Sequence, residues 1–106
     1  LNMCSPGTEV DINGSQAVNH CISSSSNTYH NDDWISVEFL VFADSIVHQI
    51  IERDTVISYS NIRLGGTYLS DNFTDKIDQP LKEGYISLQS EGHPIEFRNI
   101  KIKEFD

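Results

Sequence analysis

Two side chains capable of acid–base chemistry lie close together near the carboxyl end of the sequence. Glu91 and His93 flank Gly92, in a segment whose composition predicts a tight turn. A carboxylate beside an imidazole can move protons at neutral pH, because imidazole titrates near that pH. Glu91 and His93 are therefore the candidate catalytic residues. The same pattern also fits a histidine that only braces the turn before Pro94.

Aromatic and polar side chains flank this pair. Tyr85 and Gln89 share one face of the strand predicted before the turn, and Glu96 and Arg98 share one face of the strand predicted after it. An aromatic ring covers the C–H face of a sugar while polar groups bond its hydroxyls. These four residues, with Trp34 as a stacking platform, are the candidate substrate-binding residues. The alternatives are a solvated sheet face with Glu96 paired to Arg98, and a core position for Trp34.

The remaining chemistry-bearing residues give weaker signals. His48 lies in an apolar run, which is more typical of a structural histidine, and His20 and His30 lie in loop-like sequence. No phosphate loop, nucleotide fingerprint or His-Glu-x-x-His motif occurs in the sequence. We therefore expect no cofactor. The acids between Asp71 and Asp78 could hold calcium, but they lack the regular ligand spacing of a defined loop, so the sequence does not support a metal site.

Length and charge limit the classes of partner. The 106 residues support one domain at most, so residues 1–106 are either a single β-sandwich domain or the carboxy-terminal portion of one. Their 16 acidic against 7 basic residues give a net charge of −9. That charge disfavours binding to nucleic acid or to an anionic membrane. No apolar run approaches the roughly 20 residues of a membrane span. A neutral carbohydrate ligand is compatible with this composition.

Cys4 and Cys21 are the two cysteines of the chain, and they enclose a segment rich in turn residues with little core of its own. A disulfide across a loop of that size is worth about 3 kcal/mol in the chain-entropy model. Two buried free thiols are the alternative. We favour the disulfide, which indicates an exported protein.

The pattern of apolar residues predicts an all-β fold. Asn13-Gly14 between two apolar runs is a strong hairpin signal. Alternation of period two over residues 35–41, followed at short spacing by β-rich runs at residues 45–51 and 55–59, predicts a meander, with Ala43-Asp44 at its first turn. Residues 60–82 read as one long loop, and no helix is expected. The final strands are residues 84–89 and 95–105, with a bulge near Arg98-Asn99. Residues predicted to be buried together are Ile35, Val37, Phe39, Ile86 and Leu88.

The segment from Gly84 to Ile102 resembles the closing hairpin of the 3-keto-disaccharide hydrolase domain family. Upstream segments are similar to the middle of that domain; they are Cys4 to Thr8, His20-Cys21, Ser24 to Tyr29, Trp34, Asp44 to Val47, and Asp54 to Val56. The resemblance implies a concanavalin A-like jelly-roll β-sandwich of antiparallel sheets in a secreted or periplasmic bacterial protein. The resemblance also implies that the chain covers only about half of the full family domain, its carboxy-terminal portion. A missing amino-terminal half, or self-association through open strand edges, would complete the fold.

The resemblance also implies a function. It predicts a glycoside hydrolase acting on 3-keto-glycosides or disaccharides, in which a base removes the acidified C–H beside the ketone, the aglycone is eliminated and the product is hydrated. A non-catalytic, lectin-like carbohydrate-binding module is the alternative. A purely architectural fragment is the third possibility.

Overall fold

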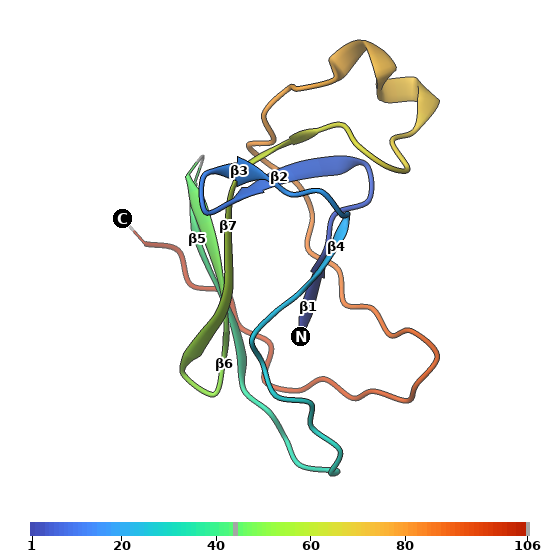
Figure 1. Cartoon of the computed structure of the whole chain (residues 1–106). Helices are drawn as coiled ribbons and strands as arrows, with labels where there is room; N and C mark the ends of the chain where they lie inside the picture. Colours follow the sequence, from blue (N-terminus) through green and yellow to red (C-terminus); the bar gives the residue numbers. More distant parts are fainter. Residues whose placement is uncertain (44, 106) are drawn as a thin grey trace.

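The computed structural model describes residues 1–43 and 45–105, and these residues form antiparallel sheets (Figure 1). Asp44, assigned above to the turn after Ala43, lies outside the described residues. One sheet has five strands in the order β3-β2-β7-β6-β5, and the other pairs β1 with β4. The prediction of an all-β fold is confirmed, and the antiparallel sheets are consistent with a β-sandwich. The elements are β1 (Asn2–Cys4), β2 (Thr8–Ile12), β3 (Ser15–Gln16), β4 (Cys21–Ser23), β5 (Val37–Phe42), β6 (Ile46–Ile51), β7 (Asp54–Leu64) and the 3-10 helix η1 (Asp71–Lys76).

The predicted hairpin at Asn13-Gly14 joins β2 to β3. Asp11 pairs with Gln16 and Ile12 with Ser15, which leaves Asn13 and Gly14 as a two-residue turn. Both turn residues have positive φ, 52° and 81°. A type I′ turn requires positive φ at both positions, and Asn-Gly meets that requirement at little steric cost. Local turn chemistry alone therefore sets this register.

The predicted meander forms β5, β6 and β7, but β7 is longer than the sequence indicates. It continues to Leu64, through a region predicted to be loop, because Thr8 and Glu9 of β2 pair with Leu64 and Arg63. This partner comes from the other end of the chain, so the local pattern could not reveal it. The expectation of no helix is also wrong: η1 forms where the Ser70 carbonyl accepts a hydrogen bond from the Phe73 amide.

The core is small and lies on one face of the five-stranded sheet. The apolar side chains that are buried most completely come from β1, β2 and β6: Met3, Val10, Val47 and Ile51. On β6 the buried residues alternate with half-buried ones, as expected for a strand covered on one face. This core face carries Val47, Gln49 and Ile51.

The prediction of a shared core for β5 and the last strands is wrong. Val37 and Phe39 face the same way as Ile51 and Gln49, their cross-strand partners, so their side of the sheet was predicted correctly. They are nevertheless 45% and 57% exposed, and Ile86 and Leu88 are 80% and 53% exposed. Period two determines which face a side chain occupies, but burial needs a second layer above that face. The two short strands β1 and β4 do not supply one over β5.

The two final strands predicted from the sequence are also corrected. Residues 84–105 run as an extended chain without sheet pairing, and all of them are exposed (Figure 1). The last backbone tie before this segment is the hydrogen bond from the Leu81 amide to the Ile62 carbonyl, at 2.9 Å. A strand needs a neighbour to satisfy its amides and carbonyls. Without a ladder there is no bulge, but Asn99 has φ 56° at the position where the apolar pattern changes phase.

Candidate functional site

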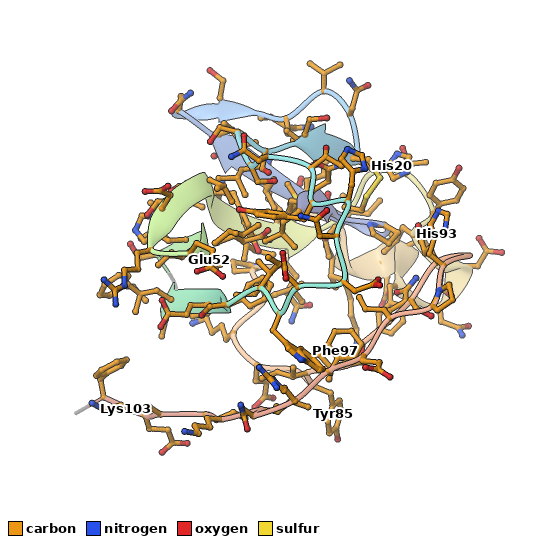
Figure 2. The ribbon with its side chains drawn as sticks, turned by 90° about the horizontal axis from the view of Figure 1, so that it is seen from below. His20, Glu52, Tyr85, His93, Phe97 and Lys103 are labelled. Atoms are coloured by element: carbon orange, nitrogen blue, oxygen red, sulfur yellow. A yellow bond between two sulfur atoms is a disulfide. The ribbon has the colours of Figure 1, made fainter. Side chains whose placement is uncertain are left out.

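The candidate catalytic residues lie on an exposed bend. Gly92, between them, has φ 69°, in the left-handed region that favours glycine. Glu91 and His93 are both exposed, and Figure 2 shows His93 on the carboxyl-terminal segment. The Gln89 side chain donates a hydrogen bond from Nε2 to Oε1 of Glu91, at 3.1 Å. One substrate-binding candidate therefore contacts one catalytic candidate.

Two further candidates meet from distant parts of the chain. The Cζ atom of Arg98 lies 4.0 Å from the centroid of the Trp34 ring, which is a cation–π contact. Trp34 is 46% exposed, so it is not a core residue. Among the described residues no ion pair joins Glu96 to Arg98. The guanidinium thus lies on the indole ring, and the alternative of a Glu96–Arg98 pair is wrong here.

Tyr85 and Glu96 do not join either contact. Tyr85 is fully exposed, and Figure 2 shows it well separated from His93 along the segment. Glu96 is exposed as well. The shared strand faces predicted for these residues require a paired strand, and residues 84–105 form none. The structure therefore brings together Gln89 with Glu91 and Trp34 with Arg98, and leaves the other candidates apart.

A charged cluster centred on Arg63 was missed from the sequence. Its guanidinium is 3.1 Å from Oδ1 of Asp11, 3.7 Å from Oε2 of Glu9 and 4.0 Å from Oδ1 of Asp78, and it donates to Oε1 of Gln16 at 2.9 Å. The Arg63 side chain is only 12% exposed. Strands β2, β3 and β7 all contribute to the cluster, and its one cation faces two carboxylates from β2 and a third from the segment after η1. The signal available in the sequence was that residues between Ser58 and Arg63 still mix polar residues, Ser58, Ser60 and Asn61, with Tyr59 and Ile62, as an extended strand would.

Asp11 is held in its charged form by this cluster. A hydrogen bond from the Asn61 side chain, at 2.9 Å, is the largest cause and lowers the pKa of Asp11 below its ordinary value of 3.8. Partial burial opposes the change, and the hydrogen bond and charge of Arg63 reinforce it. With its carboxylates engaged by Arg63, this cluster has the character of a structural ion-pair network.

His48 has better-defined surroundings than the candidate catalytic histidine. It lies in the middle of β6, half-buried, with Nδ1 2.6 Å from Oγ of Ser58 on β7. The ring of Phe42 meets the imidazole edge-on, with centroids 6.1 Å apart. The interpretation of His48 as a structural histidine rested on its apolar neighbours in sequence, and the contact with Ser58 comes from the pairing of β6 with β7.

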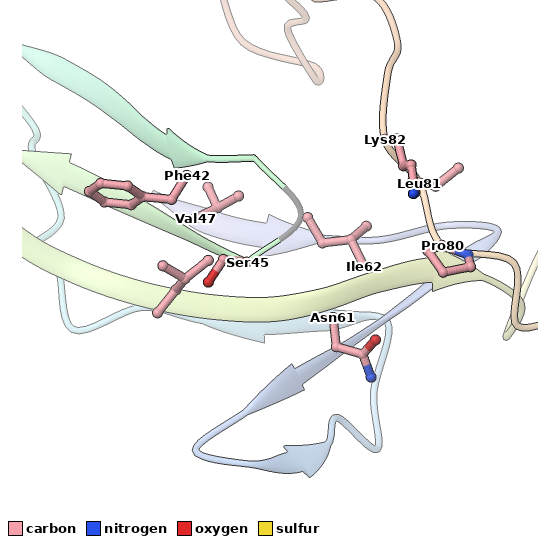
Figure 3. A pocket seen from close by; sticks show the side chains of 9 residues that line it. Phe42, Ser45, Val47, Asn61, Ile62, Pro80, Leu81 and Lys82 are labelled. Atoms are coloured by element: carbon pink, nitrogen blue, oxygen red, sulfur yellow. The ribbon is translucent and has the colours of Figure 1, made fainter. Parts of the chain in front are cut away.

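A cavity of about 260 Å³ opens at the end of the β5–β6 hairpin (Figure 3). None of the residues predicted for the site lines it. Its walls come from Phe42 and Ile46 on the hairpin, from Ile62 on β7, and from Pro80 and Leu81 where the chain leaves the sheet. Lys82 lies at the same cavity. Ser45 and Asn61 line it as well, so the wall of this hollow is mixed, with both apolar and polar side chains.

The disulfide predicted between Cys4 and Cys21 is present, and it joins directly paired residues of β1 and β4. Within residues 1–43 and 45–105, no three His, Cys, Asp or Glu side chains are grouped as metal ligands would be. No helix in this part of the chain is long and apolar enough to cross a membrane.

Comparisons with known proteins agree with the resemblance found from the sequence. The family model described as a 3-keto-alpha-glucoside-1,2-lyase-like domain matches residues 6–103. No curated protein matches the chain, and no solved structure matches it either. Because the family model covers nearly the whole chain, from before β2 to the end of the carboxyl-terminal segment, this protein belongs to the 3-keto-alpha-glucoside-1,2-lyase-like domain family.

Proposed function

We propose that this protein is a carbohydrate-active domain that acts on 3-keto-glycosides or 3-keto-disaccharides. The single observation that carries the proposal is the family match over residues 6–103, whose description names a lyase acting on a 3-keto-glucoside. The net charge of −9 fits a neutral ligand better than an anionic one. The contact of Arg98 with Trp34 supports a ligand site at the carboxyl-terminal segment, because it places an aromatic ring against the segment that also carries Glu96 and His93.

The reaction follows from the chemistry of the ketone. A carbonyl at C3 acidifies the C2–H bond, so a carboxylate such as Glu91 can take that proton. The electron pair of the C2–H bond forms the C1–C2 double bond, and the C1–O bond breaks. The leaving oxygen takes a proton from protonated His93, and both side chains exchange protons with water afterwards. Addition of water to the enone completes net hydrolysis.

Turnover of a 3-keto-glycoside against its 3-hydroxy parent tests this proposal. Wild-type protein should release the aglycone from the 3-keto compound and leave the parent glycoside intact. His93→Gln and Glu91→Gln should each lower the rate roughly 100-fold, the low end for acid–base groups. His30→Gln is the matched control, since His30 is also an exposed loop histidine. Equal turnover of both glycosides would contradict a role for the ketone.

A non-catalytic sugar-binding module is the second candidate. The exposure of Glu91, His93 and Tyr85 favours it, because general acid–base catalysis usually works in a site from which water is excluded. Saturable binding of the 3-keto-glycoside without release of the aglycone, at high protein concentration, would select this candidate. Release of the aglycone that depends on His93 would reject it.

We also propose that the open core face is covered in the working protein, either by the other half of a longer domain or by a second copy. The half-exposed Val37 and Phe39, which face the same side as buried Ile51, support this. Light scattering of the chain alone measures whether it self-associates. The Cys4–Cys21 disulfide supports an exported location, where disulfides form and persist.

A further inference from the structure

The five-stranded sheet has a second face, opposite the small core. Side chains alternate between the faces of a strand, so the neighbours of Val47 and Gln49 on β6 point the other way. We call this the outer face, and it carries side chains from β5, β6 and β7. Its members used below are Glu38, Leu40, Phe42, Ile46, His48 and Ser58.

His48 occupies the middle of the outer face and is held in place from β7. The pairing of β6 with β7 puts His48 directly opposite Ser58, and the distance from Nδ1 to Oγ is 2.6 Å. That contact uses one ring nitrogen and orients the other, Nε2. Among the described residues, Nε2 has no hydrogen-bond partner. It accepts a hydrogen bond when Nδ1 donates to Ser58, and it donates one when Ser58 donates to Nδ1.

Strand β5 places an aromatic ring and a carboxylate on either side of this imidazole. Leu40 lies directly opposite His48, and Glu38 and Phe42 are the neighbours of Leu40 on the same face of β5. Cross-strand neighbours are about 5 Å apart and diagonal neighbours about 7–8 Å apart. At these spacings aromatic and long side chains on neighbouring strands are still within reach of one another. Phe42 is 51% exposed, and its ring lies nearly perpendicular to the imidazole of His48, at an interplanar angle of 83°.

We propose that the outer face binds a neutral pyranoside, with its C–H face on Phe42 and its hydroxyls on Nε2 of His48 and the carboxylate of Glu38. This inference rests on the proposed function for the class of ligand, and it assigns a sugar-contacting surface separate from the carboxyl-terminal segment. Ser58 is a positioning residue, acting through the ring of His48. The cavity beside Phe42 and Ile46 gives a ring substituent or an aglycone a place next to this surface (Figure 3).

A purely structural pair would look different on this face. A cross-strand hydrogen bond that only fixes register needs no solvent-exposed aromatic ring beside it. Here a polar pair lies between apolar residues, Leu40 and Ile46, on a face that the chain leaves open at Glu38 and Phe42. An aromatic platform with hydrogen-bonding groups at its edge is the usual composition of a sugar site, because the ring and the polar groups meet different parts of the ligand.

Titration of the full chain with methyl α-glucopyranoside and its 3-keto form, followed by NMR of the histidine rings, tests the proposal. The His48 signals should shift with saturation while those of His30 stay constant. His48→Gln, which retains a hydrogen-bonding group toward Ser58, and Phe42→Leu should each weaken binding roughly tenfold. Ser58→Ala should weaken it less and change the tautomer signature of His48. His30→Gln should bind as the wild type does.

The outcomes separate this inference from the proposed function. Sugar binding or turnover that is unchanged in His48→Gln and Phe42→Leu overturns the outer-face site and leaves the proposed function standing. A saturable His48 shift without release of any aglycone supports the outer-face site and rejects the elimination. If the wild-type protein shows neither a shift of the His48 signals nor release of an aglycone, both the outer-face site and the proposed function are overturned. If His48→Gln does not fold, the wild-type titration and Phe42→Leu still decide.

Discussion

The guanidinium of Arg98 lies over the indole ring of Trp34, with its Cζ atom 4.0 Å from the ring centroid. Trp34 precedes β5, and Arg98 belongs to the carboxyl-terminal segment, which makes no sheet pairing. The contact therefore links the carboxyl-terminal segment to the residues that lead into β5. It also joins two residues that the pattern of the sequence had assigned to one substrate site for separate reasons.

Replacing Arg98 should be visible in the fluorescence of Trp34, the single tryptophan of the chain. In Arg98→Ala the ring loses its cover, so emission should shift to longer wavelength. Arg98→Lys keeps the charge without the planar fork, and the shift should be intermediate. An exposed cation–π contact is worth about 0.5–1 kcal/mol, so the change in unfolding free energy should be of that size. Arg53→Ala, in the exposed β6–β7 turn, is the control. Emission spectra of Arg98→Ala and Arg98→Lys that are identical to the spectrum of the control Arg53→Ala would contradict the contact.

Loss of the Cys4–Cys21 disulfide should loosen the two-stranded sheet. The bridge joins directly paired residues of β1 and β4, and those strands are only three residues long. In the chain-entropy model a loop of this size contributes about 3 kcal/mol, so Cys4→Ser/Cys21→Ser should lower the free energy of unfolding by about that amount. Chemical denaturation measures it. Alkylation without reductant should leave the mass of the wild type unchanged, and uptake of two alkyl groups would contradict the bridge.

Truncating apolar residues of one sheet face should have very different costs on neighbouring strands. Ile51 is 4% exposed, so Ile51→Ala should cost about 2–5 kcal/mol of unfolding free energy. Phe39 shares that face but is 57% exposed, so Phe39→Ala should cost less than about 1 kcal/mol. Urea unfolding of both variants gives the comparison. A large cost for Phe39→Ala at all protein concentrations would show that β5 is covered within a single chain. A cost that grows with concentration would indicate a second copy.

Acid should remove the stabilising contribution of Asp11. The folded-state pKa of Asp11 lies below 3.8 because Asn61, and then Arg63, bond its charged form. A group whose pKa is lowered by folding stabilises the folded state fully at pH values above its pKa in the unfolded state. This contribution disappears as the pH falls through its pKa in the folded state. Asp11→Asn should therefore be less stable than the wild type at about pH 6, and the gap should close as the pH falls below 3.8 and through the lower folded-state pKa. Asp32→Asn, an exposed loop acid, is the control. A gap independent of pH would contradict the linkage.

Local patterns determined the parts of this fold that local physics controls. Asn13-Gly14 predicted the β2–β3 hairpin, because those two residues tolerate the positive φ that the turn requires. Three β-rich runs at short spacing predicted the β5–β6–β7 meander, and the period-two alternation of the first run predicted the face on which Val37 and Phe39 lie. The cysteine count and the turn-rich segment between Cys4 and Cys21 predicted the disulfide. Each of these follows from residues that are close in sequence or from a single covalent possibility.

Tertiary structure decided everything that needs a partner from elsewhere in the chain. Residues 84–89 and 95–105 alternate as strands do, but a strand exists only where a neighbour accepts its hydrogen bonds, and none does so here. Phe39 points to the core face and stays exposed, because burial depends on a covering layer that no period can specify. Arg63 gathers its carboxylates, and Ser58 meets His48, across pairings between strands. Such long-range registers are set by the packed sheet as a whole, which is why the Arg63 cluster and the Ser58–His48 contact appear only in three dimensions.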